Sequence, residues 1–310
     1  MKVIFMGTPD FSVNTLKYIK DAGHEILLVV SQPDKPKGRG KAMLPTPVKE
    51  AALAMSLPVY QPKRVRDPES IKYLSEYKAD IIVVVAFGQI LPKEILDMPK
   101  FGCVNVHASL LPKYRGAAPI QWAVIDGEAV SGVTTMRMDE GLDTGDMILK
   151  TEVVLDEKET GGSLFEKLAE EGAKLCVKTL QEIENNTAVF TPQDHESATH
   201  TRMIKKQLGE INWNTKAVEI ERLIRGLNPW PSAFTKLNGK MMKIWAAHVT
   251  DQMTSEKPGT ITGVTGNEIA VQTKEGTLIL TEIQMEGKKR MSVQAFLRGF
   301  ELEKGIVLNE

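Results

Sequence analysis

The chain has 310 residues, with 39 Lys and Arg against 40 Asp and Glu and a formal net charge of −1 at pH 7. This length predicts two domains, each able to bury its own core, and the near-neutral charge excludes a bulk polycation, so any nucleic-acid surface has to be a local patch. Two cysteines exclude a disulfide framework and favour a reducing compartment.

The first residues, MKVIFMG, enter a strand pattern directly. They lack the charged segment followed by a long apolar segment that marks a secretory signal. No uninterrupted apolar run approaches the roughly 20 residues that span a bilayer. We therefore expect a cytoplasmic protein with no membrane partner.

Residues 1 to about 110 alternate between strand and helix patterns. Buried-strand patterns cover 2–6, 25–30 and 79–87, and the last of these, ADIIVVVAF, is apolar on both faces like a central parallel strand. Apolar residues at helical spacing follow at 11–19 and 48–56. The alternation predicts a doubly wound, mostly parallel, Rossmann-like α/β sheet, whose ligands bind beyond the carboxyl ends of the strands.

The turn after the first strand, GTPDF, disfavours nucleotide binding. It has one glycine where the dinucleotide fingerprint G-x-G-x-x-G needs three, and Pro9 removes a backbone donor. The phosphate-binding pattern G-x-x-x-x-G-K-[ST] does not occur in the sequence. An NAD-type oxidoreductase is therefore a poor fit.

Residues 32–49 form the most basic segment of the first domain, with Asp34 as its only acidic residue. Its basic residues stand among Pro and Gly, and they are Lys35, Lys37, Arg39, Lys41 and Lys49. Such a segment predicts a loop outside the sheet that is mobile or ordered by a partner. It is either a solvated basic loop or a set of phosphate contacts.

The stretch 101–119, FGCVNVHASLLPKYRGAAP, carries the strongest chemical signal. Its start predicts a short strand, and because alternate side chains share a face, Asn105 and His107 project together. An amide and an imidazole held side by side suit a carbonyl oxygen that gains negative charge during attack. Residues 109–116 predict a loop that walls this site and carries the charge of Arg115. The alternative is a pair of capping or surface side chains.

The segment 138–147, MDEGLDTGDM, brings Asp139, Asp143 and Asp146 together with two glycines. Glycine lets the backbone turn sharply and approach a ligand closely. A carboxylate from this segment can orient or charge His107, as in acid–base pairs. The alternatives are an ordinary acidic turn or a cation loop. The oxygen spacing of an EF-hand is absent, so we expect no metal.

The second half begins with strand patterns at 131–137 and 147–155 and an amphipathic helix at 163–183. The polar stretch that follows leads us to place the first domain at 1–188 and a linker at 189–206.

The last hundred residues, 207–310, have a different pattern. A helix at 215–225 and the sequence NPWP precede short strands predicted at 233–237, 242–249, 259–263, 268–273 and 277–282. Such regular short strands predict a small β-barrel.

Two segments, NVHASLLPKYRGAAP and GLDTGD, resemble the signature segments of the folate-dependent formyltransferase family. The opening GTPDF, the basic QPDKPKGRGKAMLPTPVK and the later NPWP resemble the tRNA-formylating members of that family, in order and over essentially the whole chain. The resemblance implies a formyltransferase-type catalytic domain followed by an OB-like tRNA-binding domain. One position departs from the family, because Asn212 stands where its I-D-W segment has Asp.

The resemblance implies transfer of a formyl group from 10-formyltetrahydrofolate to the α-amino group of methionine on initiator tRNA. It assigns Asn105 and His107 as donors to the oxyanion, and Asp143 as the residue that holds His107 and helps to take the amine proton. The implied folate contacts are Phe87, Gly88, Gln89, Ile90, Leu91, Ser109, Leu110, Leu111, Pro112, Asp139 and Gly141. The implied tRNA contacts are Lys35, Lys37, Arg39, Lys41, Arg202, Lys205 and Lys206.

Three alternatives remain open at this stage. A relative with another acceptor, either glycinamide ribonucleotide or a sugar-nucleotide amine, leaves the basic segment and the C-terminal barrel unexplained. A non-enzymatic RNA-binding protein would use the barrel alone, and a dehydrogenase lacks its glycine fingerprint. We expect a monomeric enzyme that uses no metal.

Overall fold

The computed structural model describes residues 1–37 and 42–309 and divides into two compact units. Unit 1 comprises Met1–Gly116, Val130–Val154 and Phe165–Thr201. Unit 2 comprises Ala117–Ala129, Leu155–Leu164 and Arg202–Glu310. The two units therefore interleave along the chain, and the domain boundaries at 188 and 206 stay a prediction.

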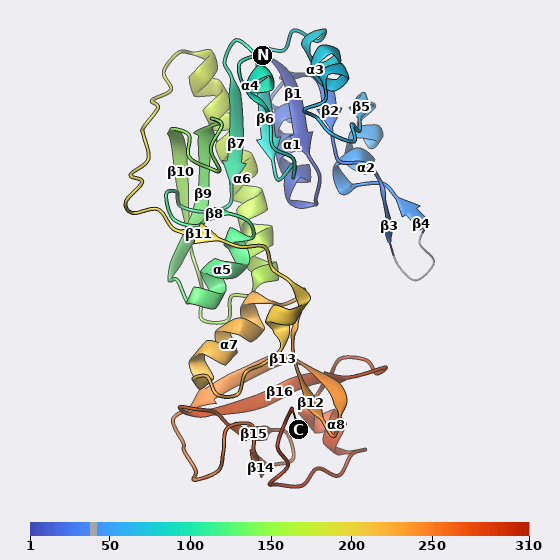
Figure 1. Cartoon of the computed structure of the whole chain (residues 1–310), viewed down its shortest axis with the longest axis vertical. Helices are drawn as coiled ribbons and strands as arrows, with labels where there is room; N and C mark the ends of the chain where they lie inside the picture. The colour runs from blue at the N-terminus through green and yellow to red at the C-terminus, as the bar shows by residue number, and fades with distance from the viewer. Residues whose placement is uncertain (38–41, 310) are drawn as a thin grey trace. The chain divides into compact units, whose positions relative to one another are not determined.

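Unit 1 is built around a sheet that, in the described residues, has seven strands in the order β10-β9-β7-β6-β1-β2-β5 (Figure 1). These strands are β1 (Lys2–Gly7), β2 (Glu25–Val30), β5 (Val59–Tyr60), β6 (Ile81–Val85), β7 (Cys103–His107), β9 (Val130–Arg137) and β10 (Met147–Val154). The strands from β7 to β5 pair in parallel, whereas β9 is antiparallel to both of its neighbours. All of β6 and β7 is buried, as expected for central parallel strands. The predicted mostly parallel α/β sheet is confirmed.

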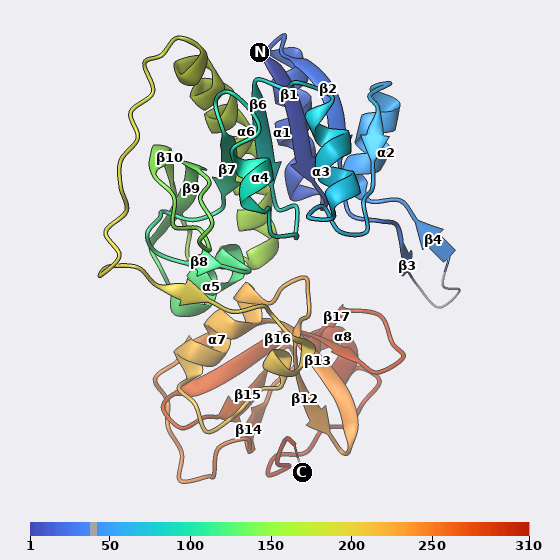
Figure 2. The ribbon, with the colours of Figure 1, turned by 45° about the horizontal axis from the view of Figure 1, so that its top comes forward.

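Helices cover both faces of this sheet (Figure 2). They are α1 (Phe11–Asp21), α2 (Pro47–Ala54), α3 (Pro68–Ser75), α4 (Lys93–Leu96) and α6 (Gly161–Glu184). Helices α1 and α6 share one face, where the rings of Phe11 and Phe165 meet edge to face at 5.4 Å. On the other face, Leu74 of α3 and Ile95 of α4 pack into one buried cluster with Ile4 of β1. Apolar residues on both sides of the strands thus make the two-sided core that the sequence predicts.

Two segments predicted as loops contain short strands. The described ends of the basic segment pair antiparallel as β3 (Lys35–Lys37) and β4 (Ala42–Leu44), a ribbon separate from the main sheet. Near the candidate site, β8 (Arg115–Gly116) pairs in parallel with β11 (His200–Thr201). Strands of two or three residues show no periodicity, and β8 finds its partner far along the chain, so sequence reasoning missed both pairs.

Unit 2 is built around an antiparallel sheet with the order β12-β13-β16-β15-β14, in which β17 also pairs with β16. Its strands are β12 (Ala233–Leu237), β13 (Lys240–Thr250), β14 (Ile261–Val264), β15 (Ile269–Gln272), β16 (Thr277–Met285) and β17 (Met291–Ser292). Its helices are α5 (Pro119–Asp126), η1 (Lys206–Gly209), α7 (Ala217–Gly226) and α8 (Val293–Leu297). The five predicted short strands are all present, and their closure into an OB-like barrel stays a prediction.

Over the described part of the chain, we find no helix with the length and apolar character needed to cross a membrane.

Candidate active site

The candidate site lies on the face of β7 from which Asn105 and His107 project. Strand β7 is parallel to β6 and antiparallel to β9, where His107 lies opposite Thr134. Alternation puts Cys103 on the same face, and the Cys103 thiol contacts carbonyl oxygens of α4, so this is the face that α4 partly covers. Asn105 and His107 are 8% and 7% exposed. The two side chains are therefore held among packed groups rather than displayed on the surface.

Asn105 offers an unused donor at this face. Among the residues that the structure describes, its side-chain amide has no hydrogen-bond partner. A mostly buried amide without a protein partner is costly unless water or a ligand satisfies it. The amide is therefore available to a bound substrate.

His107 has distinct surroundings at its two ring nitrogens. Its Nε2 lies 2.9 Å from the carbonyl oxygen of Tyr114. A carbonyl oxygen only accepts, so Nε2 must carry the proton and donate it. Nδ1 faces Oδ2 of Asp143 at 3.7 Å, which is longer than a hydrogen bond. The imidazole is thus oriented from one side by a backbone carbonyl and from the other by a carboxylate.

Asp143 reaches His107 because the loop after β9 folds back along β7. The last residue of β9, Arg137, pairs with Val104, so the loop leaves level with the start of β7 and not with its end. Gly145 allows this return, since a Cβ there would lie only 1.7 Å from the carbonyl oxygen of Arg137. Asp143 itself adopts a left-handed φ of 53°, a conformation that Asp tolerates better than most residues. Its Oδ2 accepts a hydrogen bond from the Gly116 nitrogen at 2.8 Å.

Asp139 has a role inside this loop. It is exposed, and its Oδ1 accepts from the Gly141 nitrogen at 3.0 Å and from the Thr144 hydroxyl at 2.7 Å. These two bonds form an Asx-type turn that shapes the loop containing Asp143. Contacts of Asp139 and Gly141 with folate stay a prediction.

The residues after β6 differ in what they offer to a ligand. Phe87 and Leu91 are buried in the apolar cluster beside α4, whereas Ile90 is 81% exposed. Gln89 is occupied, because its Oε1 accepts from the Val65 nitrogen at 2.7 Å. Only Ile90 in this segment therefore displays a large apolar side chain to solvent.

The carbonyl groups of the same segment are partly engaged. The Phe87 carbonyl accepts from the Thr8 hydroxyl at 2.9 Å and from Nε2 of Gln32 at 3.2 Å. The same Gln32 nitrogen lies 2.8 Å from the Gly88 carbonyl oxygen. Gln32 thus holds the turn after β6, where Gly88 has a left-handed φ of 80°.

The segment after β7 is fastened to the sheet. The fully buried Thr134 donates to the Ser109 carbonyl at 2.7 Å and accepts from the Leu111 nitrogen at 3.1 Å. The ammonium group of Lys150 donates to the Leu111 carbonyl, and burial lowers the pKa of Lys150. Leu110 and Pro112 are half-buried. Because β6 and β7 are parallel neighbours, these residues leave the same sheet edge as Phe87–Leu91.

The sequence did not indicate the burial of Arg115 or the presence of Gln193 beside the site. Arg115 was expected to carry a charge on the wall of the site, but it is 3% exposed and bonds to Gln193. Gln193 is 5% exposed and lies in the stretch expected to be a linker. A single Gln in a polar, aperiodic stretch gives no signal of burial, so the sequence alone could not place Gln193 beside the site.

The predicted tRNA contacts lie in both units. Lys35 is exposed on β3, and Lys37 is the last residue of β3; the predicted contacts Arg39 and Lys41 lie outside the described residues. In unit 2, three predicted contacts are exposed, namely Arg202, Lys205 and Lys206. The guanidinium of Arg202 lies 5.6 Å from the centre of the Trp122 ring, and Trp122 donates to the Arg202 carbonyl at 2.8 Å.

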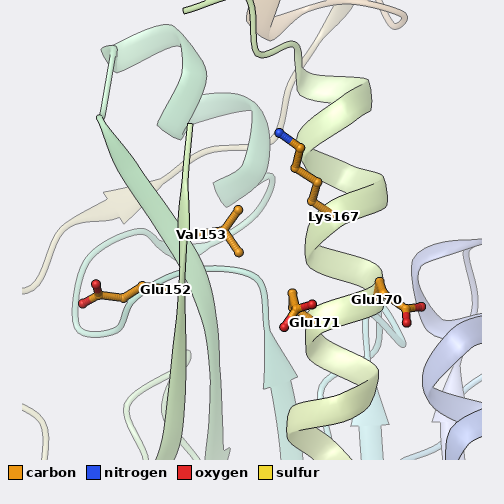
Figure 3. Close-up of a pocket in the computed structure, with 5 residues that line it drawn as sticks. All are labelled: Glu152, Val153, Lys167, Glu170 and Glu171. Atoms are coloured by element: carbon orange, nitrogen blue, oxygen red, sulfur yellow. The ribbon is translucent and has the colours of Figure 1, made fainter. Parts of the chain in front are cut away.

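A hollow of about 370 Å³ lies between β10 and α6 (Figure 3). It is lined by Glu152, Val153, Lys167, Glu170 and Glu171. None of its lining residues belongs to the candidate site. In the part of the chain that the structure describes, no three His, Cys, Asp or Glu side chains are grouped so that they could hold a metal ion.

Comparisons with known proteins agree across the chain. The sequence matches the formyl transferase family over residues 1–180 and the formyl transferase C-terminal domain over residues 203–301. It is 64% identical over 305 residues to the methionyl-tRNA formyltransferase of Agathobacter rectalis, covering 98% of each chain.

Two solved structures share the fold. An N-formyltransferase from Helicobacter canadensis, in complex with folinic acid and dTDP-3-aminofucose, has a TM-score of 0.68 at 22% identity, covering 92% of this chain and 100% of that one. The methionyl-tRNA formyltransferase of Clostridium thermocellum has a TM-score of 0.55 at 19% identity, with coverages of 92% and 99%. At these identities the likeness extends to the fold alone.

Proposed function

Since the chain belongs to the formyl transferase family, we propose that it transfers the formyl group of 10-formyltetrahydrofolate to the α-amino group of methionine on initiator tRNA. High identity over nearly the full length to a methionyl-tRNA formyltransferase supports this acceptor. The observation that carries the chemistry is the grouping of Asn105, His107 and Asp143 at one face of β7, with the Asn105 amide unpartnered among the described residues.

The co-substrate supplies an activated formyl carbon, whose oxygen becomes negatively charged when an amine attacks that carbon. The adduct then collapses: the carbonyl re-forms, the bond from the formyl carbon to N10 of the folate breaks, and N10 leaves with the proton that the amine has lost, passed on through Asp143. Asn105 donates its amide hydrogen to the formyl oxygen, because the amide stands on a strand in a mostly buried position and needs little reorganisation. His107 donates from Nε2. In the structure the Tyr114 carbonyl accepts this hydrogen, and we propose that the oxyanion, a stronger acceptor, replaces that carbonyl in the transition state.

Asp143 orients His107 and receives the proton that the attacking amine loses. Its Oδ2 already accepts from the Gly116 nitrogen, which fixes the carboxylate, and Oδ1 is left to accept a proton directly or through water. The carboxylate also stabilises a positively charged His107 imidazole if that ring shares the proton. A fixed acid–base pair beside two donors is what amine acylation requires.

The residues at the edge shared by β6 and β7 suit the folate. The segments 87–91 and 109–112 follow adjacent parallel strands and offer apolar side chains and backbone groups, which fit a flat heterocycle rich in donors and acceptors. We propose that Ile90 and Leu110 contact its ring faces, since Ile90 is exposed and Leu110 half-buried. Among the described residues the backbone groups of 89–91 have no hydrogen-bond partner, whereas every carbonyl of 109–112 is engaged, so we propose that residues 89–91 read its edge.

The proposal that tRNA carries the formyl acceptor also rests on the basic residues and on the second domain. We propose that residues 1–188 carry out the chemistry and that 207–310, joined by the linker 189–206, bind tRNA together with the basic segment 32–49. The substrate belongs to translation, so we place the enzyme in the cytoplasm, and we propose that it acts as a monomer without metal. The N-formyltransferase from Helicobacter canadensis, whose structure contains dTDP-3-aminofucose, shares the fold at 22% identity only, which gives no support to a sugar-nucleotide acceptor here.

The test is direct transfer of a labelled formyl group. The purified chain is incubated with labelled 10-formyltetrahydrofolate and, in separate reactions, with methionyl-initiator tRNA, glycinamide ribonucleotide and an amino-sugar nucleotide. We expect label in N-formylmethionine released from tRNA, and none in either small amine. Formylation of a small amine but not of the tRNA would overturn the acceptor, and folate-independent tRNA binding without transfer would overturn the chemistry.

A further inference from the structure

The stretch after α6 contains a glutamine that is buried against the loops of the candidate site. Gln193 is 5% exposed, although its neighbours Pro192 and Asp194 are exposed. It lies in unit 1 with the site. A buried amide needs partners for its oxygen and its nitrogen, and both of these atoms of Gln193 are bonded.

The side-chain nitrogen of Gln193 holds the backbone of the acidic loop, residues 138–146 between β9 and β10. Nε2 donates to the carbonyl oxygens of Asp143 at 2.9 Å and Gly145 at 2.8 Å, which uses both of its hydrogens. Asp143 is also the residue with the left-handed φ of 53° and the carboxylate that faces His107. Gln193 therefore fixes the main chain of the residue on which the position of that carboxylate depends.

The oxygen of Gln193 holds a buried arginine. Oε1 accepts from Nε of Arg115 at 3.0 Å and from Nη2 at 2.7 Å, and two such bonds set the plane of the guanidinium. Nη1 of Arg115 also lies 3.2 Å from Nδ1 of His195. Within the described residues Arg115 forms no ion pair, so neutral acceptors hold this buried charge. Burying a charge without a counterion is unfavourable. We therefore expect it where the buried group fixes the position of neighbouring residues.

Arg115 stands between the two backbone groups that touch the His107–Asp143 pair. The carbonyl of Tyr114, which precedes it, accepts from Nε2 of His107. The nitrogen of Gly116, which follows it, donates to Oδ2 of Asp143. The Gln193–Arg115 contact thus ties together the main chain on both sides of the pair.

We propose that Gln193 and Arg115 are positioning residues for the formyl transfer proposed above, setting the separation and orientation of His107 and Asp143 without touching substrate. A displacement of about 1 Å at reacting groups can cost on the order of 10²-fold in rate. The predicted signature is a fall in kcat with little change in folate affinity, because the segments 87–91 and 109–112 are held by other side chains, namely Gln32, Thr134 and Lys150.

Two substitutions at Gln193 separate positioning from simple filling of space. Gln193→Leu removes the hydrogen bonds to Arg115, Asp143 and Gly145, and Gln193→Glu keeps an acceptor for Arg115 but loses both donors to the loop after β9. Each variant is expected to lower kcat about 30-fold or more and to keep the folate dissociation constant within about threefold. The matched control is Glu196→Gln, an exposed position in the same stretch, which is expected to leave both quantities unchanged.

A double-mutant cycle tests whether Gln193 acts through Asp143. Single-turnover transfer, at enzyme concentrations above tRNA, is measured for Asp143→Asn with and without Gln193→Glu. If Gln193 acts by holding Asp143, the second substitution costs less than about threefold in the variant that already lacks the carboxylate. Effects that simply multiply would overturn the proposal, as would near wild-type kcat in both single Gln193 variants. A wild-type chain that transfers no formyl group contradicts the proposed function instead.

Discussion

The ring of His107 donates from Nε2 to the carbonyl oxygen of Tyr114, 2.9 Å away. The acceptor is a backbone group, so the orientation of the imidazole depends on the path of the main chain at Tyr114, which precedes Arg115. Asp143 approaches the opposite nitrogen at 3.7 Å. His107 is therefore held from one side by the loop 109–116 and from the other by the loop after β9, and Gln193 links these two loops.

The first prediction concerns the two proposed oxyanion donors. Asn105→Ala and His107→Ala are each expected to lower kcat by about 10²-fold or more, the scale of losing one such donor. The melting temperature is expected to move by no more than about 4 °C, because neither side chain belongs to an apolar cluster. Steady-state formyl transfer and thermal unfolding measure the two quantities, with the exposed His248→Ala as a control. Turnover near wild type in either variant removes that residue from the proposed mechanism.

The second prediction separates the charge of Asp143 from its shape. Asp143→Asn keeps the size of the side chain and its carbonyl acceptor for the Gly116 nitrogen, but it cannot take a proton. We expect kcat to fall by about 10²-fold or more while folate binding, followed by quenching of protein fluorescence, stays within about threefold. Loss of folate binding together with activity indicates a structural role of Asp143 in its loop.

Local patterns in the sequence predicted which segments form strands, but they did not always predict where each strand ends. The strand Glu25–Val30 has the predicted bounds, because a short apolar run between polar residues determines them. The strand predicted at 79–87 spans only Ile81–Val85, since Ala86 adopts a left-handed φ of 46°. Alanine rarely adopts a positive φ, so nothing in the sequence indicated this conformation.

The site was predictable only where it depends on one strand. Alternation along β7 is sufficient to place Asn105 and His107 on one face. The approach of Asp143 depends on a loop that folds back, and its role came from resemblance to a family rather than from strand order. Gln193 acts through contacts with residues about fifty and eighty positions away, and long-range contacts of this kind leave no local pattern.

The third prediction concerns Lys150, which holds the segment proposed to bind folate. Lys150→Met leaves the Leu111 carbonyl without this donor and is expected to raise the folate dissociation constant several-fold and to lower stability by about 1–3 kcal/mol. Equilibrium binding and urea unfolding measure these effects. Lys178→Met, at an exposed position of α6, is the matched control and is expected to change neither.

The same lysine gives a pH dependence with a definite sign. Burial lowers the pKa of Lys150 in the folded chain, so below 10.5 the unfolded chain binds this proton more tightly than the folded one. The contribution of Lys150 to stability therefore rises with pH across the window below 10.5. The difference in unfolding free energy between wild type and Lys150→Met is expected to be larger at pH 10 than at pH 7, and a smaller one contradicts the lowered pKa of Lys150.

The fourth prediction concerns Cys103 and Cys176, both buried and free. Burial raises the pKa of each thiol to about 12, so almost no thiolate exists at pH 8. A thiol-specific disulfide reagent is expected to modify neither cysteine in the native chain and both after unfolding in urea. Because each thiol has a higher pKa in the folded chain than in the unfolded chain, it contributes stability that is fully present below pH 9.0. This contribution is lost as the pH rises toward 12. Rapid modification of the native chain means that the core opens locally.

The last prediction tests the tRNA partner through the basic segment 32–49. If Lys37, Arg39 and Lys41 contact phosphates, each contact releases condensed counterions, so the affinity for tRNA falls steeply with salt. Replacing all three by Ala is expected to weaken tRNA binding and to flatten its logarithmic salt slope by about two to three. Folate affinity is expected to stay unchanged, because the proposed folate contacts follow β6 and β7 and not this segment.

The matched control for that experiment removes three exposed lysines elsewhere in unit 1, Lys72, Lys78 and Lys100. It changes the net charge by the same amount, so it separates a local contact from a general electrostatic effect. Filter binding over a series of salt concentrations gives the slope for wild type and both triple variants. Equal slopes for the three proteins mean that the basic segment is only solvated, and tRNA binding then has to come from the C-terminal domain alone. Arg39→Lys adds a finer test, because a loss of activity at constant charge shows that the planar guanidinium grips its partner through two parallel hydrogen bonds.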